Sequence, residues 1–303
     1  MQLTSQFNSA ACLLALVGAI APAGVAAQST EHQLIVTVLD GDGLPVEGLG
    51  PTDFVVREDG AAREVLRADT AGTGRQIAVL VDTSQAAADA IGDFRHGLTE
   101  FLEAMHDGNE ISLLGFGGPP RILVPSTTSL ARLQKGVGEV FGFPGTAAYL
   151  LDAMSQAAEG FARRESARPI LVALTTEGLD YSNASSGQVL RRVQASGAAV
   201  YTLVLRGRSG ARADPSLSPS DLRRLEIERN IVLERGPRDS GGDRRDVLTS
   251  TAVGHALRKL ATELRNQYLV TYSRPDALIP PDGIEVAATR AGLTARGTPL
   301  RAN

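Results

Sequence analysis

The fold is indicated most clearly by the stretch QIAVLVDTS at residues 76–84. Residues 77–81 are all apolar, which is typical of a strand buried on both faces, as in parallel sheets covered by helices. This strand ends in an acid and two hydroxyl residues, Asp82, Thr83 and Ser84. Open α/β sheets have their binding crevice at this end of the strands. A carboxylate with a hydroxyl two residues on offers hard oxygen ligands, which suit Mg²⁺, Mn²⁺ or Ca²⁺.

Downstream of this stretch, segments of strand and helix character alternate, which predicts a doubly wound, mostly parallel α/β sheet. The connection at residues 117–120, Gly-Gly-Pro-Pro, is short enough to make the strands on either side of it antiparallel neighbours. The sheet is expected to have six strands, at residues 76–81, 111–116, 122–124, 170–174, 200–205 and 268–272.

The segments on both sides of this sheet have patterns of their own. Residues 28–72 predict a small N-terminal β unit, and residues 274–303 predict a C-terminal β-hairpin. The main domain is expected at residues 75–273. Within it, residues 206–246 are rich in Arg, Asp, Ser, Pro and Gly and predict a charged surface insertion. A partner-binding role for this insertion stays open, because long insertions in compact domains are often functional.

The N-terminal segment, residues 1–27, has no charged side chain and predicts a secretory signal peptide cleaved after Ala27. Its apolar run is shorter than the roughly 20 residues that a membrane-spanning helix needs, so we expect no stable membrane anchor after cleavage. Cys12, the only cysteine, lies in this segment, and the mature protein therefore has no disulfide. The sequence thus predicts an exported protein, periplasmic or extracellular.

Composition and motifs also narrow the function. The net charge of −4 argues against a nucleic-acid partner, because such proteins are usually basic. The histidines are isolated, and none lies beside a nucleophile and an acid in a recognisable catalytic arrangement. The sequence has no phosphate-binding loop and no zinc-ligand spacing. We therefore expect a protein-binding protein and not an enzyme.

Three separated loops together resemble those of von Willebrand factor A-type (VWA) domains. Residues 82–86, Asp-Thr-Ser-Gln-Ala, are similar to the Asp-x-Ser-x-Ser motif of that family. Residues 145–147, Gly-Thr-Ala, stand where VWA domains place a ligand threonine, and residues 174–178, Leu-Thr-Thr-Glu-Gly, where they have Leu-Thr-Asp-Gly. Residues 256–269 resemble a family of exported bacterial VWA-related proteins. The resemblance covers the mature chain and implies a VWA, Rossmann-like fold with a small β unit before it and a hairpin after it.

The resemblance also implies a metal-ion-dependent adhesion site, in which a divalent ion leaves one position open for a carboxylate of a partner protein. By this resemblance, Mg²⁺ or Mn²⁺ is held by Asp82, Ser84, Thr146 and Glu177. Ala86 replaces the second serine of the motif and removes one oxygen, which water can supply. Glu177 replaces the usual aspartate and is one methylene longer, and Asp180 is a possible substitute acid.

Two interpretations of these residues stay open. In the first, the chain is an exported protein-interaction module that binds a partner carboxylate through this altered metal site. In the second, Asp82, Ser84 and Thr146 only cap the helices that follow them, and Glu177 is a solvated loop acid. The chain is then a metal-independent structural or assembly scaffold, which binds through its insertion or its β unit.

Overall fold

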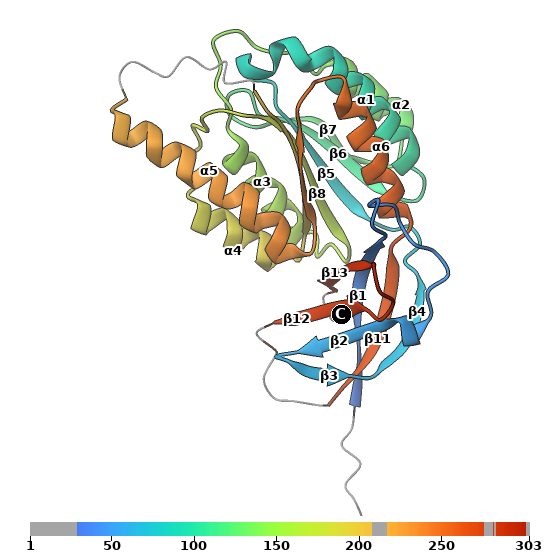
Figure 1. The fold of residues 1–303 in the computed structure, drawn as a ribbon. Coiled ribbons are helices and arrows are strands. Elements are labelled where there is room, and N and C mark those ends of the chain that lie inside the picture. Colours follow the sequence, from blue (N-terminus) through green and yellow to red (C-terminus); the bar gives the residue numbers. More distant parts are fainter. Residues whose placement is uncertain (1–28, 208–216, 276–280, 282, 301–303) are drawn as a thin grey trace, which may run out of the picture.

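A computed structural model of the chain describes residues 29–207, 217–275, 281 and 283–300. The predicted signal peptide, residues 1–27, lies outside the described residues. Figure 1 shows a larger part, in which helices cover a sheet, and a smaller β unit beside one end of that sheet. In the part of the chain that the structure describes, no helix is long and apolar enough to cross a membrane.

The larger part is built on a six-stranded sheet with the strand order β10-β9-β8-β5-β6-β7. All neighbouring strands are parallel except β7, which is antiparallel to β6, as the short connection between them predicts. The bounds are β5 (Gln76–Val81), β6 (Glu110–Gly115), β7 (Arg121–Thr127), β8 (Pro169–Thr176), β9 (Ala199–Leu205) and β10 (Asp243–Val247). The predicted doubly wound, mostly parallel sheet is confirmed.

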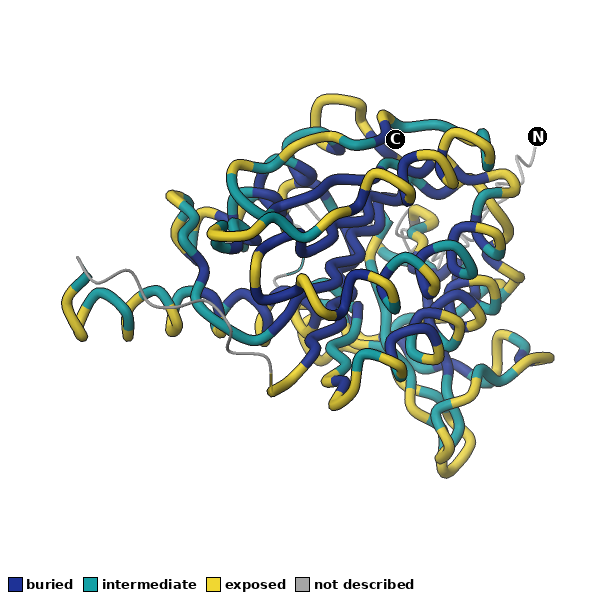
Figure 2. The backbone as a smooth tube through the Cα atoms, turned by 90° about the horizontal axis from the view of Figure 1, so that it is seen from above, coloured by how far each residue is buried: buried dark blue, intermediate teal, exposed yellow. Residues whose placement is uncertain are grey.

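Helices cover both faces of this sheet, which is why its central strands are apolar throughout. One face packs against α1 (Ile91–Met105), α2 (Leu130–Gly138) and α6 (Ala252–Arg265). The opposite face packs against α3 (Leu150–Arg163), α4 (Ser186–Ser196) and α5 (Pro219–Ser240). Every residue of β8 is buried. Figure 2 shows this core as buried chain running between helices that are more exposed on their outer sides.

The sixth strand of the sheet differs from the prediction. We expected residues 268–272, but β11 (Tyr268–Pro275) leaves this sheet and pairs antiparallel with β1 (Ser29–Leu39) and β4 (Val65–Thr70) of the smaller unit. The sixth strand is instead β10, which lies within the predicted insertion at residues 206–246. β10 has the sequence Asp-Arg-Arg-Asp-Val, and a strand this polar is tolerated because it lies at the sheet edge.

The smaller β unit is assembled from both ends of the described chain. Its four-stranded sheet has the order β13-β1-β11-β4, and its three-stranded sheet has the order β12-β2-β3. The remaining bounds are β2 (Phe54–Glu58), β3 (Ala61–Arg63), β12 (Ile284–Ala288) and β13 (Thr294–Pro299). The prediction of a C-terminal hairpin within residues 274–303 is wrong, because β12 pairs with β2 and β13 pairs with β1. Each C-terminal strand completes a different sheet, and the buried apolar core of this unit comes from the N-terminal strands and from β11.

A buried ion network joins the two parts. Glu263 of α6 is almost fully buried and accepts hydrogen bonds from Arg245 of β10 and from Arg296 of β13, the latter at 2.5 Å. Arg296 also pairs with Asp243 of β10 at 2.7 Å. Because a buried charge is costly unless it is paired, these contacts fix β13 against the edge of the larger sheet.

Candidate functional site

The candidate site lies at the carboxyl ends of β5 and β8. Asp82, the residue after β5, is fully buried. Its Oδ1 accepts a hydrogen bond from the Ser84 N–H at 2.9 Å. Its Oδ2 accepts two more, from the Thr176 N–H at 3.0 Å and from the Thr176 hydroxyl at 2.6 Å. The carboxylate is therefore fixed both by its own loop and by the end of β8, through charge-assisted hydrogen bonds.

The first two predicted loops lie together. The Gln85 N–H donates to the Thr146 carbonyl at 3.1 Å, and the Phe143 N–H donates to the Thr83 carbonyl at 2.9 Å. The Ser84 Oγ is buried and has no hydrogen-bond partner among the described residues. Thr146 donates its hydroxyl to the Phe143 carbonyl at 2.8 Å, which leaves the lone pairs of that hydroxyl available. Both hydroxyls thus lie in the loops where the sequence predicted ligands.

The side chain of Glu177, the predicted ligand in the third loop, points toward the neighbouring strand β9. The Glu177 Oε2 accepts a hydrogen bond from the Gly207 N–H at 2.8 Å, and its Oε1 lies 3.3 Å from the Arg206 guanidinium. Both partners follow β9, the neighbouring strand. Glu177 is therefore held toward β9, whereas the acid that the structure brings next to the third loop is Asp82 from the first.

Asp180, the possible substitute acid, has a structural position. It is buried, and its oxygens accept hydrogen bonds from the Leu150 N–H at 2.5 Å and the Ser182 N–H at 3.1 Å. The first of these bonds satisfies an N–H group at the start of α3, which has no partner within the helix. Burial raises the pKa of the Asp180 carboxyl to about 6, although both hydrogen bonds oppose the shift.

A buried cation that the sequence analysis did not find completes the site. Arg229 of α5 is only 3% exposed, and its guanidinium donates to the Thr176 carbonyl and, at 3.4 Å, to the Thr175 hydroxyl. Burial lowers the pKa of Arg229, while the negative charges of Asp180 and Asp82 raise it. Thr176 links the two charges, because its carbonyl accepts from Arg229 and its N–H and hydroxyl donate to Asp82.

The helix that carries this arginine does contain a sequence signal for its burial. Arg229 shares the buried face of α5 with Val232, Leu233 and Gly236, at spacings of three, four and seven residues. An arginine at an apolar-face position of an amphipathic helix indicates a buried guanidinium with polar partners.

Residues 77–178, from β5 to the third loop, match the family model described as the von Willebrand factor type A domain. This part of the chain is a VWA domain. The predicted resemblance is thereby confirmed for strands β5 to β8 and for all three loops of the candidate site. No curated protein matches the chain.

Solved structures with similarity to this chain include several VWA proteins. A von Willebrand factor type A protein from Catenulispora acidiphila is 12% identical over 90% of this chain and 72% of that one, with a TM-score of 0.47. An aerotolerance-related membrane protein from Bacteroides fragilis NCTC 9343 is 15% identical over 63% of this chain and 98% of that one, with a TM-score of 0.46. The pilus adhesin SpaC from Lactobacillus rhamnosus GG is 12% identical over 82% of this chain and 47% of that one, with a TM-score of 0.47.

The residues fit a metal-ion-dependent adhesion site in the first two loops of the VWA domain and not in the third. Ser84 and Thr146 each have an oxygen that can face a divalent ion. Ala86 offers only a methyl group, and Glu177 is held toward β9. Both oxygens of Asp82 already accept hydrogen bonds, and the buried guanidinium adds positive charge to the site. Within the described ranges, no three His, Cys, Asp or Glu side chains are grouped so as to hold a metal ion.

Exposed apolar side chains surround these loops of the VWA domain. Five large apolar side chains of the described residues are exposed, and four of them border the carboxyl edge of the sheet, each at least 49% exposed: Ile122, Phe141, Ile227 and Leu248. Ile122 lies beside the end of β6, and Phe141 lies in the loop that leads to Thr146. Ile227 is in the half of α5 that reaches the end of β8, and Leu248 directly follows β10. The fifth, Leu44, belongs to the β unit.

Proposed function

We propose that this chain is an exported protein-interaction module, periplasmic or extracellular, whose protein partner docks on the carboxyl edge of the VWA sheet. The observation that carries the proposal is the position of four exposed large apolar side chains along the carboxyl edge of the sheet, from β7 at one end to β10 at the other. Exposed apolar side chains along one edge favour a protein partner, because association removes apolar surface from water. The net charge of −4 disfavours a nucleic acid, and in this proposal the chain is not an enzyme.

Aromatic and arginine side chains strengthen the proposal. The Arg95 guanidinium lies 4.2 Å from the centre of the Phe141 ring, and that of Arg121 lies 4.9 Å from the centre of the Phe143 ring. Each cation–π pair presents a flat apolar face beside a charge, and aromatic and arginine residues are enriched at the positions that dominate binding energy. The pairs also hold the rings in place, which lowers the entropy that a partner must remove on binding.

In this proposal the carboxyl edge needs no bound divalent ion. The guanidinium group of Arg229 takes the place of a bound metal cation, and Thr176 connects it to Asp82 by hydrogen bonds. The carboxylate stays in place and keeps the three loops in one arrangement. Because Arg229 and Ile227 belong to residues 206–246, the predicted insertion and the sheet edge form one surface rather than two alternatives.

The experiment compares protein capture by variants of this surface, with the mature chain, residues 28–303, as bait. Phe141→Ser together with Leu248→Ser removes two exposed apolar side chains from the edge. Leu44→Ser is the matched control, because Leu44 and Phe141 are both 53% exposed. We expect wild type and the control to capture the same proteins from the exported fraction of the source cells, and the double variant to lose them while it stays folded. Capture that is equal for all three, or lost only with Leu44→Ser, contradicts the proposal.

A second candidate function, favoured by the unpartnered Ser84 Oγ, is metal-bridged binding of a partner carboxylate. Here Mg²⁺ or Mn²⁺ is held by Asp82, Ser84, Thr146 and Glu177. This candidate requires Glu177 to leave Arg206 and the Gly207 N–H. It predicts that a chelator and Asp82→Ala each abolish partner capture. Capture that survives the chelator rules it out and leaves the metal-independent proposal standing.

A further inference from the structure

A buried arginine and a half-buried arginine lie side by side at the end of the sheet opposite to the candidate site. Arg75 directly precedes β5, and Arg168 directly precedes β8. The two strands are parallel neighbours in which Gln76 pairs with Pro169, so the arginines occupy equivalent positions at the amino edge of the sheet. Arg75 is only 2% exposed.

Every acceptor that these guanidinium groups contact in the described chain is a neutral backbone carbonyl. Arg75 donates to the Gly72 and Leu264 carbonyls, each at 2.5 Å. Arg168 donates to the Ala71 carbonyl at 2.5 Å and the Thr73 carbonyl at 2.6 Å. Among the described residues, no carboxylate forms an ion pair with either arginine. The nitrogens Nε of Arg75 and Nε and Nη2 of Arg168 are buried and without a partner there.

Both arginines line one small cavity of about 20 Å³ between the VWA domain and the β unit. Gln267, whose Oε1 is buried and has no hydrogen-bond partner among the described residues, also lines it, and Ile35 and Thr298 line it from strands β1 and β13 of the β unit. The volume is enough for one or two water-sized particles. This volume suits a single halide ion better than a sulfate or phosphate group.

The electrostatics of this cavity favour an anion over a water molecule. Burial and, to a smaller extent, the positive charge of Arg168 lower the pKa of Arg75 to about 10; burial also lowers the pKa of Arg168. Two like charges in a low-dielectric site are costly when no counter-charge is present. A water molecule can accept hydrogen bonds from the unpartnered N–H groups, but only an anion also offsets the two positive charges.

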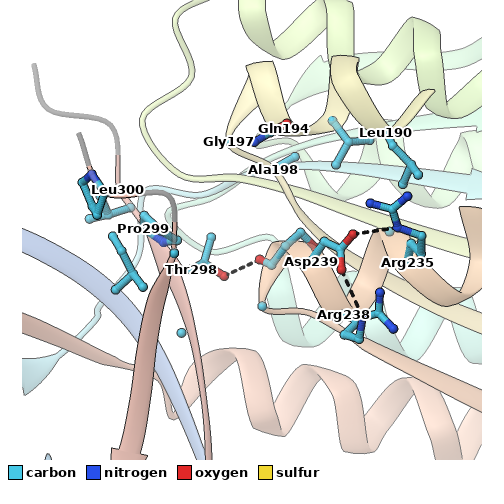
Figure 3. A pocket seen from close by; sticks show the side chains of 18 of the residues that line it. Leu190, Gln194, Gly197, Ala198, Arg235, Arg238, Asp239, Thr298, Pro299 and Leu300 are labelled. Atoms are coloured by element: carbon cyan, nitrogen blue, oxygen red, sulfur yellow. Dashed lines mark hydrogen bonds and ion pairs between the residues drawn. The ribbon is translucent and has the colours of Figure 1, made fainter. Parts of the chain in front are cut away.

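Two arginines in another, larger pocket do have a carboxylate partner. This pocket has a volume of about 820 Å³ and lies between α4, α5 and the β unit. Figure 3 shows that its arginines Arg235 and Arg238 both point at Asp239, which lies 3.1 Å from each. These arginines are partly exposed and already have a carboxylate partner, whereas Arg75 and Arg168 have none among the described residues.

We propose that the cavity between Arg75 and Arg168 binds one small monovalent anion, with chloride as the physiological ion of matching size and charge. The anion accepts hydrogen bonds from the unpartnered N–H groups of both guanidinium groups. Because strands of both parts of the molecule line the cavity, the bound anion stabilises the contact between the VWA domain and the β unit.

The first experiment measures the melting temperature of the mature protein in sodium chloride and in sodium gluconate at equal ionic strength. Binding to the folded state alone raises Tm with chloride until the site saturates, by about 5 °C at roughly 100 times the Kd. Bromide is expected to replace chloride, and gluconate and sulfate are not. Arg168→Gln should remove the difference between chloride and gluconate. Arg163→Gln, a change at an exposed arginine in a weak ion pair, should retain it.

The second experiment does not depend on any variant. Crystals of the wild-type protein soaked in sodium bromide should show an anomalous-scattering peak between Arg75 and Arg168. A chloride effect that persists in Arg168→Gln identifies a general salt effect and overturns the proposal. Equal Tm values in chloride and gluconate, or an absent bromide peak, show that water fills the cavity and overturn it as well.

Discussion

Arg229→Met removes the buried guanidinium of α5 and keeps a long apolar side chain in its place. The Thr176 carbonyl loses its charged donor, which costs about 1–3 kcal/mol for a buried group. Asp82 also loses the attraction of the positive charge on Arg229. Two unit charges attract by about 4 kcal/mol at 4 Å when the effective dielectric constant is about 20, and by about half of that at twice the distance. Relief from burying the guanidinium offsets part of the sum. We therefore expect the free energy of unfolding to fall by about 3 kcal/mol.

A double-mutant cycle with Asp82→Asn isolates the interaction between the two charges. Urea unfolding, followed by far-ultraviolet circular dichroism, is measured for the wild type, both single variants and the double variant. We expect a coupling of about 2 kcal/mol, so that Asp82→Asn costs less once Arg229 is gone. Arg235→Met, on the same helix and ion-paired to Asp239, is the control and should cost less than about 0.5 kcal/mol. If the losses in unfolding free energy of the two single variants add up to that of the double variant within about 0.5 kcal/mol, the two charges do not interact as we infer.

Three further predictions concern stability. The pKa of Asp180 is about 6 in the folded state against an ordinary 3.8, so the stability from its protonated form is present below about pH 4 and lost as the pH rises to 6. This pH dependence should disappear in Asp180→Asn, as measured by urea unfolding across that range. Gly117→Ala places a methyl group 2.2 Å from the Thr83 carbonyl and should cost about 2 kcal/mol in chemical unfolding. Glu263→Gln removes the shared carboxylate of two arginines and should lower Tm by roughly 10 °C in a thermal scan.

Each of these predictions has a clear contradiction. An unchanged pH dependence in Asp180→Asn would assign the titration to another group. Gly160→Ala is the control for Gly117→Ala, because its methyl group meets no atom within 4 Å and helical alanine is favoured by about 1 kcal/mol over glycine. Equal losses in the two glycine variants would contradict a steric cause. A Tm of Glu263→Gln equal to that of the wild type would show that the ion network does not hold the two parts together.

The features that the sequence predicted correctly depend on local patterns. The apolar run of β5 followed by Asp82 predicted a doubly buried strand with an acid at its carboxyl end, but not the full burial of that acid. The alternation of strand and helix patterns predicted the parallel sheet. Ser84 lies at the predicted edge because it follows the parallel strand β5. Thr146 lies between α2 and α3, and its carbonyl accepts a hydrogen bond from the Gln85 N–H, which joins the second loop to the first.

The features that differ depend on long-range pairing. The apolar pattern of β11 indicates a strand but does not specify the sheet, and it joins β1 and β4. β10 has too few apolar residues to be recognised, since an edge strand needs little burial. Glu177 turns toward Arg206, a partner directly after the next strand that no local motif encodes. Arg229 lies 53 positions beyond Thr176 in the sequence, so only the fold brings them together.

The measurement that tests the central claim most directly is a calorimetric titration of the mature protein with Mg²⁺ and with Mn²⁺, beside Asp82→Ala. In the function that we propose, Arg229 balances the charge of Asp82 and the site is complete without a divalent ion. We therefore predict no saturable heat in either protein, with both folded. Heat that saturates in the wild type and vanishes in Asp82→Ala would contradict the account and would establish the carboxyl edge of the VWA domain as a metal site.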